Sequence, residues 1–134
     1  MTSINLLVNT FLVGDPLNPP RFVADSSLGT DPIIYGFDPN QGSGAATKNF
    51  YMAVRNIILD TTSIDVNTKG VALNWAVSQG CSLYNVQFVM PDYSQHIGVT
   101  MTSPTSLGGG GGSGTIISDC VYIARTYYQG NMLT

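Results

Sequence analysis

Few side chains in this sequence can do chemistry, and their spacing matches no metal-binding or nucleophile motif. His96 is the single histidine and has no second His or Cys nearby, so we predict no metal site and no cofactor. Ser78 and Ser82 stand outside any nucleophile-elbow motif, and the glycine tract 108–112 lacks the Gly-Lys-Ser/Thr of a phosphate loop. The acidic residues are all aspartates, with no glutamate: Asp15, Asp25, Asp31, Asp38, Asp60, Asp65, Asp92 and Asp119.

Composition narrows the class of protein. The 134 residues suffice for one domain or a piece of a larger one, and only 10% are charged, where a soluble domain has about 25%. That balance favours a secreted protein or a segment that packs on more protein. The net charge of −3 and five scattered basic residues argue against nucleic-acid binding. Cys81 and Cys120 fit no CxxC motif; each is expected to be a small buried side chain, and a disulfide between them stays open.

Two kinds of membrane or targeting segment are not expected. No apolar run reaches the roughly 20 residues that a membrane-spanning helix needs. Residues 1–14 are apolar but lack the basic start and the cleavage site of a signal peptide. We read them as a strand that begins abruptly.

Short β-branched segments bounded by Gly, Pro, Asn or Asp predict an all-β chain. Amphipathic helical periodicity is weak everywhere, and one helical turn or a short helix is expected over 45–55. The expected strands lie near 4–13, 21–24, 32–37, 50–60, 70–77, 83–90, 96–102, 115–124 and 126–128.

Internal repetition is the most informative feature. The segment 54–60 resembles 83–89 and 117–123, with starts 29 and 34 residues apart and a shared order of apolar, polar, Asn or Asp, apolar, variable, apolar. A second motif, Gly70–Leu73, resembles Gly98–Met101, 28 residues on. Two motifs that recur together at nearly one spacing predict one coil of a solenoid.

The predicted fold is a right-handed parallel β-helix of about four to five coils, with 1–134 forming one partial domain. Equivalent residues of successive coils would stack about 4.8 Å apart. Ile57, Val86 and Cys120 would form one inward ladder and Leu59, Phe88 and Tyr122 another, with Asn56, Asn85 and Asp119 at one level. The alternative is a β-sandwich whose strands resemble each other by chance.

Four collinear segments also resemble glycoside hydrolase family 55, the exo-β-1,3-glucanases. Family members contain two right-handed β-helices built from pectate-lyase-like repeats, and this chain is similar to the first. The matching segments are Thr10–Asp15 with Asn18–Pro20, Asn49–Tyr51 with Val54–Asp60, Trp75–Val86, and His96–Val99 with the glycine tract, Ser118 and Asp119.

The resemblance implies a site that this chain supplies only in part. The family's general acid is a Glu from the second helix, and an inverting glycosidase needs such a proton donor. With no Glu here, the chain is expected to be inactive alone. By resemblance, Gln79 and Ser113 are candidates for positioning the attacking water. Trp75 is a candidate for binding substrate because an aromatic face can stack on a sugar ring, and His96 is a second such candidate. Three of these residues also have a structural interpretation: a turn residue for Gln79, a core residue for Trp75 and a hydrogen-bonded coil residue for His96.

Three functions stay open at this point. The first is a relative of the glucanase first domain that binds β-1,3-glucan or another polysaccharide, expected outside the cell as in the family. The second is a self-associating module, because the start at Ile4 and the end at Thr134 show no polar cap and open solenoid ends pair with other chains. The third is another β-helical polysaccharide protein, such as a pectate lyase or a phage tailspike, since fold alone does not settle substrate.

Overall fold

The computed structural model describes residues 2–41, 47–101 and 114–124, which are almost entirely strands and loops. Two single-turn 3-10 helices, η1 (Ser26–Leu28) and η2 (Pro39–Gln41), lie in the loops beside β4. The strands are β1 (Ile4–Asn5), β2 (Phe11–Val13), β3 (Arg21–Val23), β4 (Pro32–Tyr35), β5 (Ala53–Asp60), β6 (Val71–Asn74), β7 (Ser82–Val89), β8 (Ile97–Thr100), β9 (Ile116–Ser118) and β10 (Val121–Ile123).

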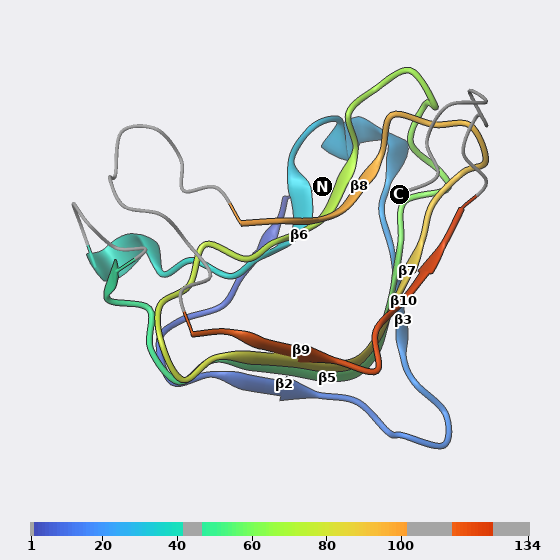
Figure 1. Cartoon of the computed structure of the whole chain (residues 1–134). Helices are drawn as coiled ribbons and strands as arrows, with labels where there is room; N and C mark the ends of the chain where they lie inside the picture. The colour runs from blue at the N-terminus through green and yellow to red at the C-terminus, as the bar shows by residue number, and fades with distance from the viewer. Residues whose placement is uncertain (1, 42–46, 102–113, 125–134) are drawn as a thin grey trace, which may run out of the picture.

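The chain winds around a three-sided outline, and the sides are formed by the parallel strands of two sheets (Figure 1). One side is the four-stranded sheet β1-β4-β6-β8. The other two sides share a six-stranded sheet, in which β5 and β7 run along both sides while β2 and β9 pair with their first halves and β3 and β10 with their second halves. All strand pairs among the described residues are parallel, which excludes the antiparallel β-sandwich alternative.

A residue with positive φ lies where the chain bends from one side of the six-stranded sheet to the other. Asn56, Asn85 and Asp119 have φ of 55°, 50° and 54°, a conformation that Asn and Asp tolerate better than most residues. The side chain of Asn56 donates to the carbonyl of Gly14 at 3.1 Å, and that of Asn85 donates to Oδ1 of Asn56 at 3.0 Å. The predicted level of Asn and Asp residues is therefore confirmed, and its amides link three coils.

The interior is filled by the inward positions of all three sides. Leu59 pairs with Phe88, which pairs with Tyr122, and the last two rings stack at 4.8 Å between centroids. Ile57 lies level with Val86, and both are buried, while Cys120 is half-buried. Both predicted apolar ladders are confirmed. The largest fully buried side chains also include Trp75, Ile33, Ile34, Met52, Leu73, Leu83, Val54 and Val77.

The structure corrects the sequence prediction in two places. Ala53 begins a strand rather than continuing a helical turn, so the helix expected over 45–55 is wrong there; residues 45–46 lie outside the described part. Val71 pairs with Ile97 rather than with Val99, so the alignment of the second motif was two residues off. A slip of two keeps every side chain on its own face, so the apolar pattern could not reveal the error. The expected strand at 126–128 also lies outside the described residues.

Candidate functional site

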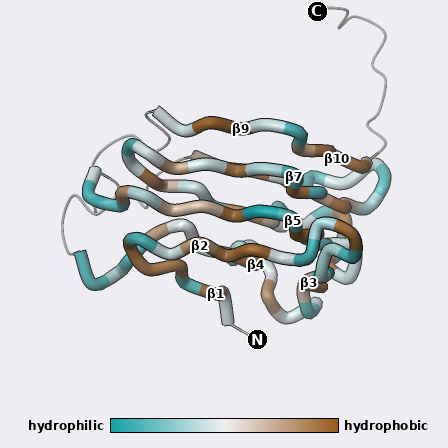
Figure 2. Tube along the Cα trace, turned by 90° about the horizontal axis from the view of Figure 1, so that it is seen from below, coloured by the Kyte–Doolittle hydropathy of each residue, from teal (hydrophilic) through white to brown (hydrophobic). Residues whose placement is uncertain are grey.

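One side of the outline carries short strands between two left-handed corners. Figure 2 shows this side, with β2, β5, β7 and β9 as successive rungs. We call it the lower face and define it by 53–55, 82–84 and 116–118. It ends on one side at Asn56, Asn85 and Asp119. Before it lies a second corner, where Asn9, Tyr51, Gly80 and Gly114 have φ of 63°, 55°, 72° and 69°.

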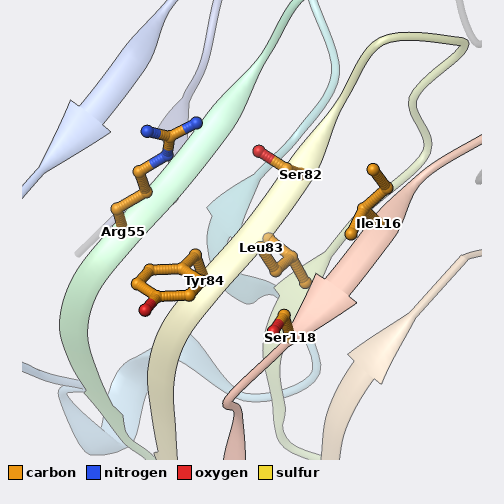
Figure 3. Close-up of a pocket in the computed structure, with 6 residues that line it drawn as sticks. All are labelled: Arg55, Ser82, Leu83, Tyr84, Ile116 and Ser118. Carbon is orange, nitrogen blue, oxygen red and sulfur yellow. The ribbon is translucent and has the colours of Figure 1, made fainter.

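A hollow of about 360 Å³ opens on the lower face (Figure 3). Strand register brings its wall together: Arg55 of β5 lies opposite Tyr84 of β7, and Tyr84 lies opposite Ser118 of β9. Ser82 lies opposite Ile116 in the same way. The hollow is lined by Arg55, Ser82, Leu83, Tyr84, Ile116 and Ser118.

The chemistry of this hollow is that of binding rather than of acid–base catalysis. Tyr84 is 47% exposed, so its side chain offers an apolar surface with a polar hydroxyl at its tip. Ser82 supplies a hydroxyl that both donates and accepts, and Arg55 supplies five N–H donors. The hydroxyl of Ser118 donates to Oδ2 of Asp119 at 2.8 Å, so it faces a ligand as an acceptor. No carboxyl group is among the lining residues in the described part of the chain. Such a set suits a neutral ligand rich in hydroxyl groups.

Gln79 lies at the corner before β7 and is exposed. Its side chain packs against Gly114, where an added Cβ would lie 3.5 Å from Cγ of Gln79. Its carbonyl accepts from the backbone N–H of Tyr51 at 3.4 Å. Gln79 is therefore beside the residue that follows Ser113, whereas Ser113 itself lies outside the described residues.

Trp75 and His96 lie away from the hollow. Trp75 has no exposed surface and packs against Gly36, so neither face of its ring is open to a sugar. The two ring nitrogens of His96 are both engaged, Nδ1 with Oγ1 of Thr61 at 2.8 Å and Nε2 with the carbonyl of Asp65 at 3.0 Å. Trp75 is therefore a core residue and His96 a hydrogen-bonded coil residue, which are the structural interpretations that the sequence left open for them.

The buried carboxyl groups serve the fold. Burial alone would raise the pKa of Asp60, but hydrogen bonds from Thr62 and the Arg21 guanidinium, 2.6 Å away, hold it below its usual value. Burial acts likewise on Asp38, where backbone N–H groups of Asn40 and Val8 outweigh it and lower the pKa. Within the described ranges no group of three His, Cys, Asp or Glu side chains could hold a metal ion. No described helix is long and apolar enough to cross a membrane.

The two cysteines are unpaired. Cys81 is buried, accepts from the backbone N–H of Met52 at 3.4 Å and donates to the carbonyl of Asn49 at 3.2 Å. Burial raises the pKa of its thiol, and burial also raises the pKa of Cys120. The structure therefore answers the open question about a disulfide: each thiol is free.

The sequence alone did not identify Arg55, Tyr84 and Ser118 as a group. Their signal was present in the repeat, because all three occupy its polar position just before the Asn or Asp. Outward ladders of a solenoid are as informative as inward ones, since both are brought together by register.

Comparison with known proteins agrees with this architecture. The family model described as "Rhamnogalacturonase A/epimerase, pectate lyase-like" matches residues 1–130. The chain belongs to this pectate-lyase-like family. A search of solved structures finds no significant match to this family member.

Its curated relatives are much longer proteins. A "Probable glucan endo-1,3-beta-glucosidase" of Arthroderma benhamiae is 34% identical over 126 residues, which is 88% of this chain and 13% of that protein. "Glucan endo-1,3-beta-glucosidase BGN13.1" of Trichoderma harzianum is 32% identical over 56% of this chain and 10% of its own length. "Non-secreted LysM effector LysM19" of Penicillium expansum is 37% identical over 61% of this chain and 7% of its own length. The pectate-lyase-like chain thus spans about a tenth of the relatives it matches.

Proposed function

We propose that residues 1–134 form one partial domain, a right-handed parallel β-helix of four to five coils, that binds β-1,3-glucan on its lower face and does not cleave it alone. The observation that carries the proposal is the hollow of Tyr84, Ser82, Ser118 and Arg55, in a chain whose relatives include proteins named as glucan endo-1,3-beta-glucosidases. An aromatic ring flanked by hydroxyls and the N–H donors of a guanidinium is suited to a sugar ring with its peripheral hydroxyl groups.

Inactivity in isolation follows from the acids that are present. Hydrolysis of a glycosidic bond by this class of enzyme needs a carboxylic acid to protonate the leaving oxygen. The chain has no Glu, and its buried aspartates Asp38 and Asp60 have lowered pKa values, which keep them ionised near neutral pH. Gln79 and Ser113 are proposed to position water only when a proton donor comes from other polypeptide.

We propose the β-1,3 linkage of the glucan that is bound, and not an exo or endo mode of cleavage. The family resemblance indicates exo-acting enzymes, whereas two relatives are named as endo-acting glucosidases. An extracellular location is part of the same proposal, because the family that the chain resembles is one of extracellular enzymes.

The test is binding of laminari-oligosaccharides to the purified chain by isothermal titration calorimetry, with cello-oligosaccharides as the linkage control. We expect binding to the β-1,3-linked ligand, a loss in Tyr84→Ala, and no change in Tyr93→Ala. Tyr93 is a matched control, since it is 48% exposed and lies in the loop between β7 and β8. Absence of binding to laminari-oligosaccharides, or equal binding by Tyr84→Ala, would overturn the proposal. Glucose release that tracks the purified chain would overturn the claim of inactivity.

Exposed core-type residues support a second candidate, end-to-end association. Ile117 and Tyr122 occupy inward ladder positions, yet they are 41% and 52% exposed on the last described coil. Strands at such an edge offer unpaired backbone groups to another chain. Light scattering over a range of concentrations tests this candidate: growth of oligomers with concentration supports it, and a constant monomer mass refutes it.

A further inference from the structure

Tyr51 is the unusual member of its corner. The equivalent residues of the neighbouring coils are Asn9, Gly80 and Gly114, and all four adopt positive φ. Asn and Gly enter this left-handed region at small cost, whereas a bulky aromatic residue there is strained. Strain of this kind persists where the surrounding structure imposes it, and it gathers at functional sites.

The ring of Tyr51 lies so close to the backbone of the next coil that only glycine fits there. A Cβ added to Gly80 would lie 2.8 Å from Cδ1 and 2.9 Å from Cε1 of Tyr51. The rest of the ring faces outward, since Tyr51 is 62% exposed. Phe50 stands beside it with 6.1 Å between ring centroids. One side of the ring is thus supported by protein and much of the remainder is open.

The neighbours of this ring belong to the proposed site. The backbone N–H of Tyr51 donates to the carbonyl of Gln79, whose side chain packs against Gly114 one coil further on. Tyr51 precedes the lower face by two residues, and Arg55 follows it by four, which is about 13 Å of extended strand. The ring and the hollow therefore lie at two ends of one continuous surface.

We propose that Tyr51 is a second contact for the glycan, a supported aromatic platform on which a pyranose ring stacks next to Gln79. This inference rests on the proposed function and adds to it a residue and a direction: the glycan runs along the strands, from the corner at Tyr51 to the hollow at Tyr84. The apolar C–H face of a β-linked glucose unit lies on the ring, and its hydroxyl groups are within reach of the amide of Gln79.

The variant Tyr51→Asn separates binding from folding. Asn occupies the same corner position at Asn9 with φ of 63°, so the backbone accepts it. We expect thermal stability equal to or above that of the wild type. We expect affinity for laminari-oligosaccharides to fall about tenfold, the change produced by losing an aromatic contact of about 1.4 kcal/mol. Tyr51→Phe keeps the ring and should bind as the wild type does.

Tyr93→Asn is the matched control, because Tyr93 also has positive φ, at 57°, and lies off the lower face. It should leave affinity unchanged. An ultraviolet difference spectrum gives an independent measurement: the tyrosine signal induced by the oligosaccharide should shrink in Tyr51→Asn and persist in Tyr93→Asn. Equal affinity and an equal difference signal in Tyr51→Asn and wild type would overturn the platform.

The result is distinguishable from failure of the proposed function. If the wild type binds no laminari-oligosaccharide, the function itself is wrong. If the wild type binds and Tyr84→Ala loses binding while Tyr51→Asn does not, the function stands and the platform is wrong.

Discussion

Replacing Asn56 by Ala should destabilise the fold strongly, because this half-buried corner residue combines two side-chain hydrogen bonds with a positive φ. The side chain of Asn56 makes two hydrogen bonds, donating to the carbonyl of Gly14 and accepting from Nδ2 of Asn85. Each is worth about 1 kcal/mol net. Ala must also hold φ of 55°, which costs about 1 kcal/mol more than in a residue that tolerates this region. The expected loss is about 3 kcal/mol, a large share of the roughly 5–15 kcal/mol that stabilises a typical domain.

Asn56→Gly divides this loss into its parts. Glycine removes the same two hydrogen bonds but accepts positive φ, so it should cost about 1 kcal/mol less than alanine. Asn67→Ala is the control, since Asn67 is exposed in a loop and has ordinary backbone angles; it should stay within about 0.5 kcal/mol of wild type.

Urea denaturation followed by the fluorescence of Trp75 measures these differences. Trp75 is the single tryptophan and is fully buried, so its emission reports on the core. In the double variant, the losses from Asn56→Ala and Asn85→Ala should not add, because the two residues share one hydrogen bond. A loss below about 1 kcal/mol for Asn56→Ala, or equal losses for Ala and Gly, would refute the reasoning.

Three further predictions concern other parts of the fold. Asp60→Asn should lower stability at neutral pH, and its difference from wild type should vanish in acid. The reason is that the lowered pKa of Asp60 gives stability that is present above about pH 3.9 and is lost as the pH falls through the folded-state pKa. Urea midpoints measured across pH test this prediction. Cys81 should resist alkylation until the protein unfolds, measured by mass spectrometry; rapid labelling of the native protein would contradict its burial. Gly14→Ala should unfold at lower urea than wild type, because its methyl would collide with the carbonyl oxygen of Asn56; an unchanged midpoint would contradict that close approach.

The sequence predicted those features that repeat with a constant period. Leu59, Phe88 and Tyr122 could be aligned because apolar residues recur at fixed offsets within the motif, and the register confirms them. The asparagine level was likewise visible, since Asn56 and Asn85 follow the same polar position.

Features that depend on three-dimensional exposure could not be predicted in this way. Trp75 resembled a sugar-stacking residue by type, but whether its ring faces the core is decided by where the chain turns between β6 and β7. The φ of Tyr51 has no sequence signal of its own, because the positive-φ preference at that corner is carried by Asn9, Gly80 and Gly114 in other coils. The register of β6 and β8 was missed because its loops differ in length while both alignments keep the same face inward.

The corners also couple folding to binding. Arg55, Tyr84 and Ser118 come from three coils, and strand register brings them to one hollow, with the amides of Asn56 and Asn85 linking two of those coils. A slip of one residue in any coil would turn its outward side chain into the core. The ladder residues therefore position the binding residues without touching a ligand. It follows that Asn85→Ala should weaken glycan affinity in native conditions, although its own side chain lies outside the hollow, and that the weakening should grow with temperature as the corner loosens. Titrations at several temperatures test this coupling. If Asn85→Ala binds the glycan as tightly as the wild type does at every temperature, the coils keep their register without the ladder.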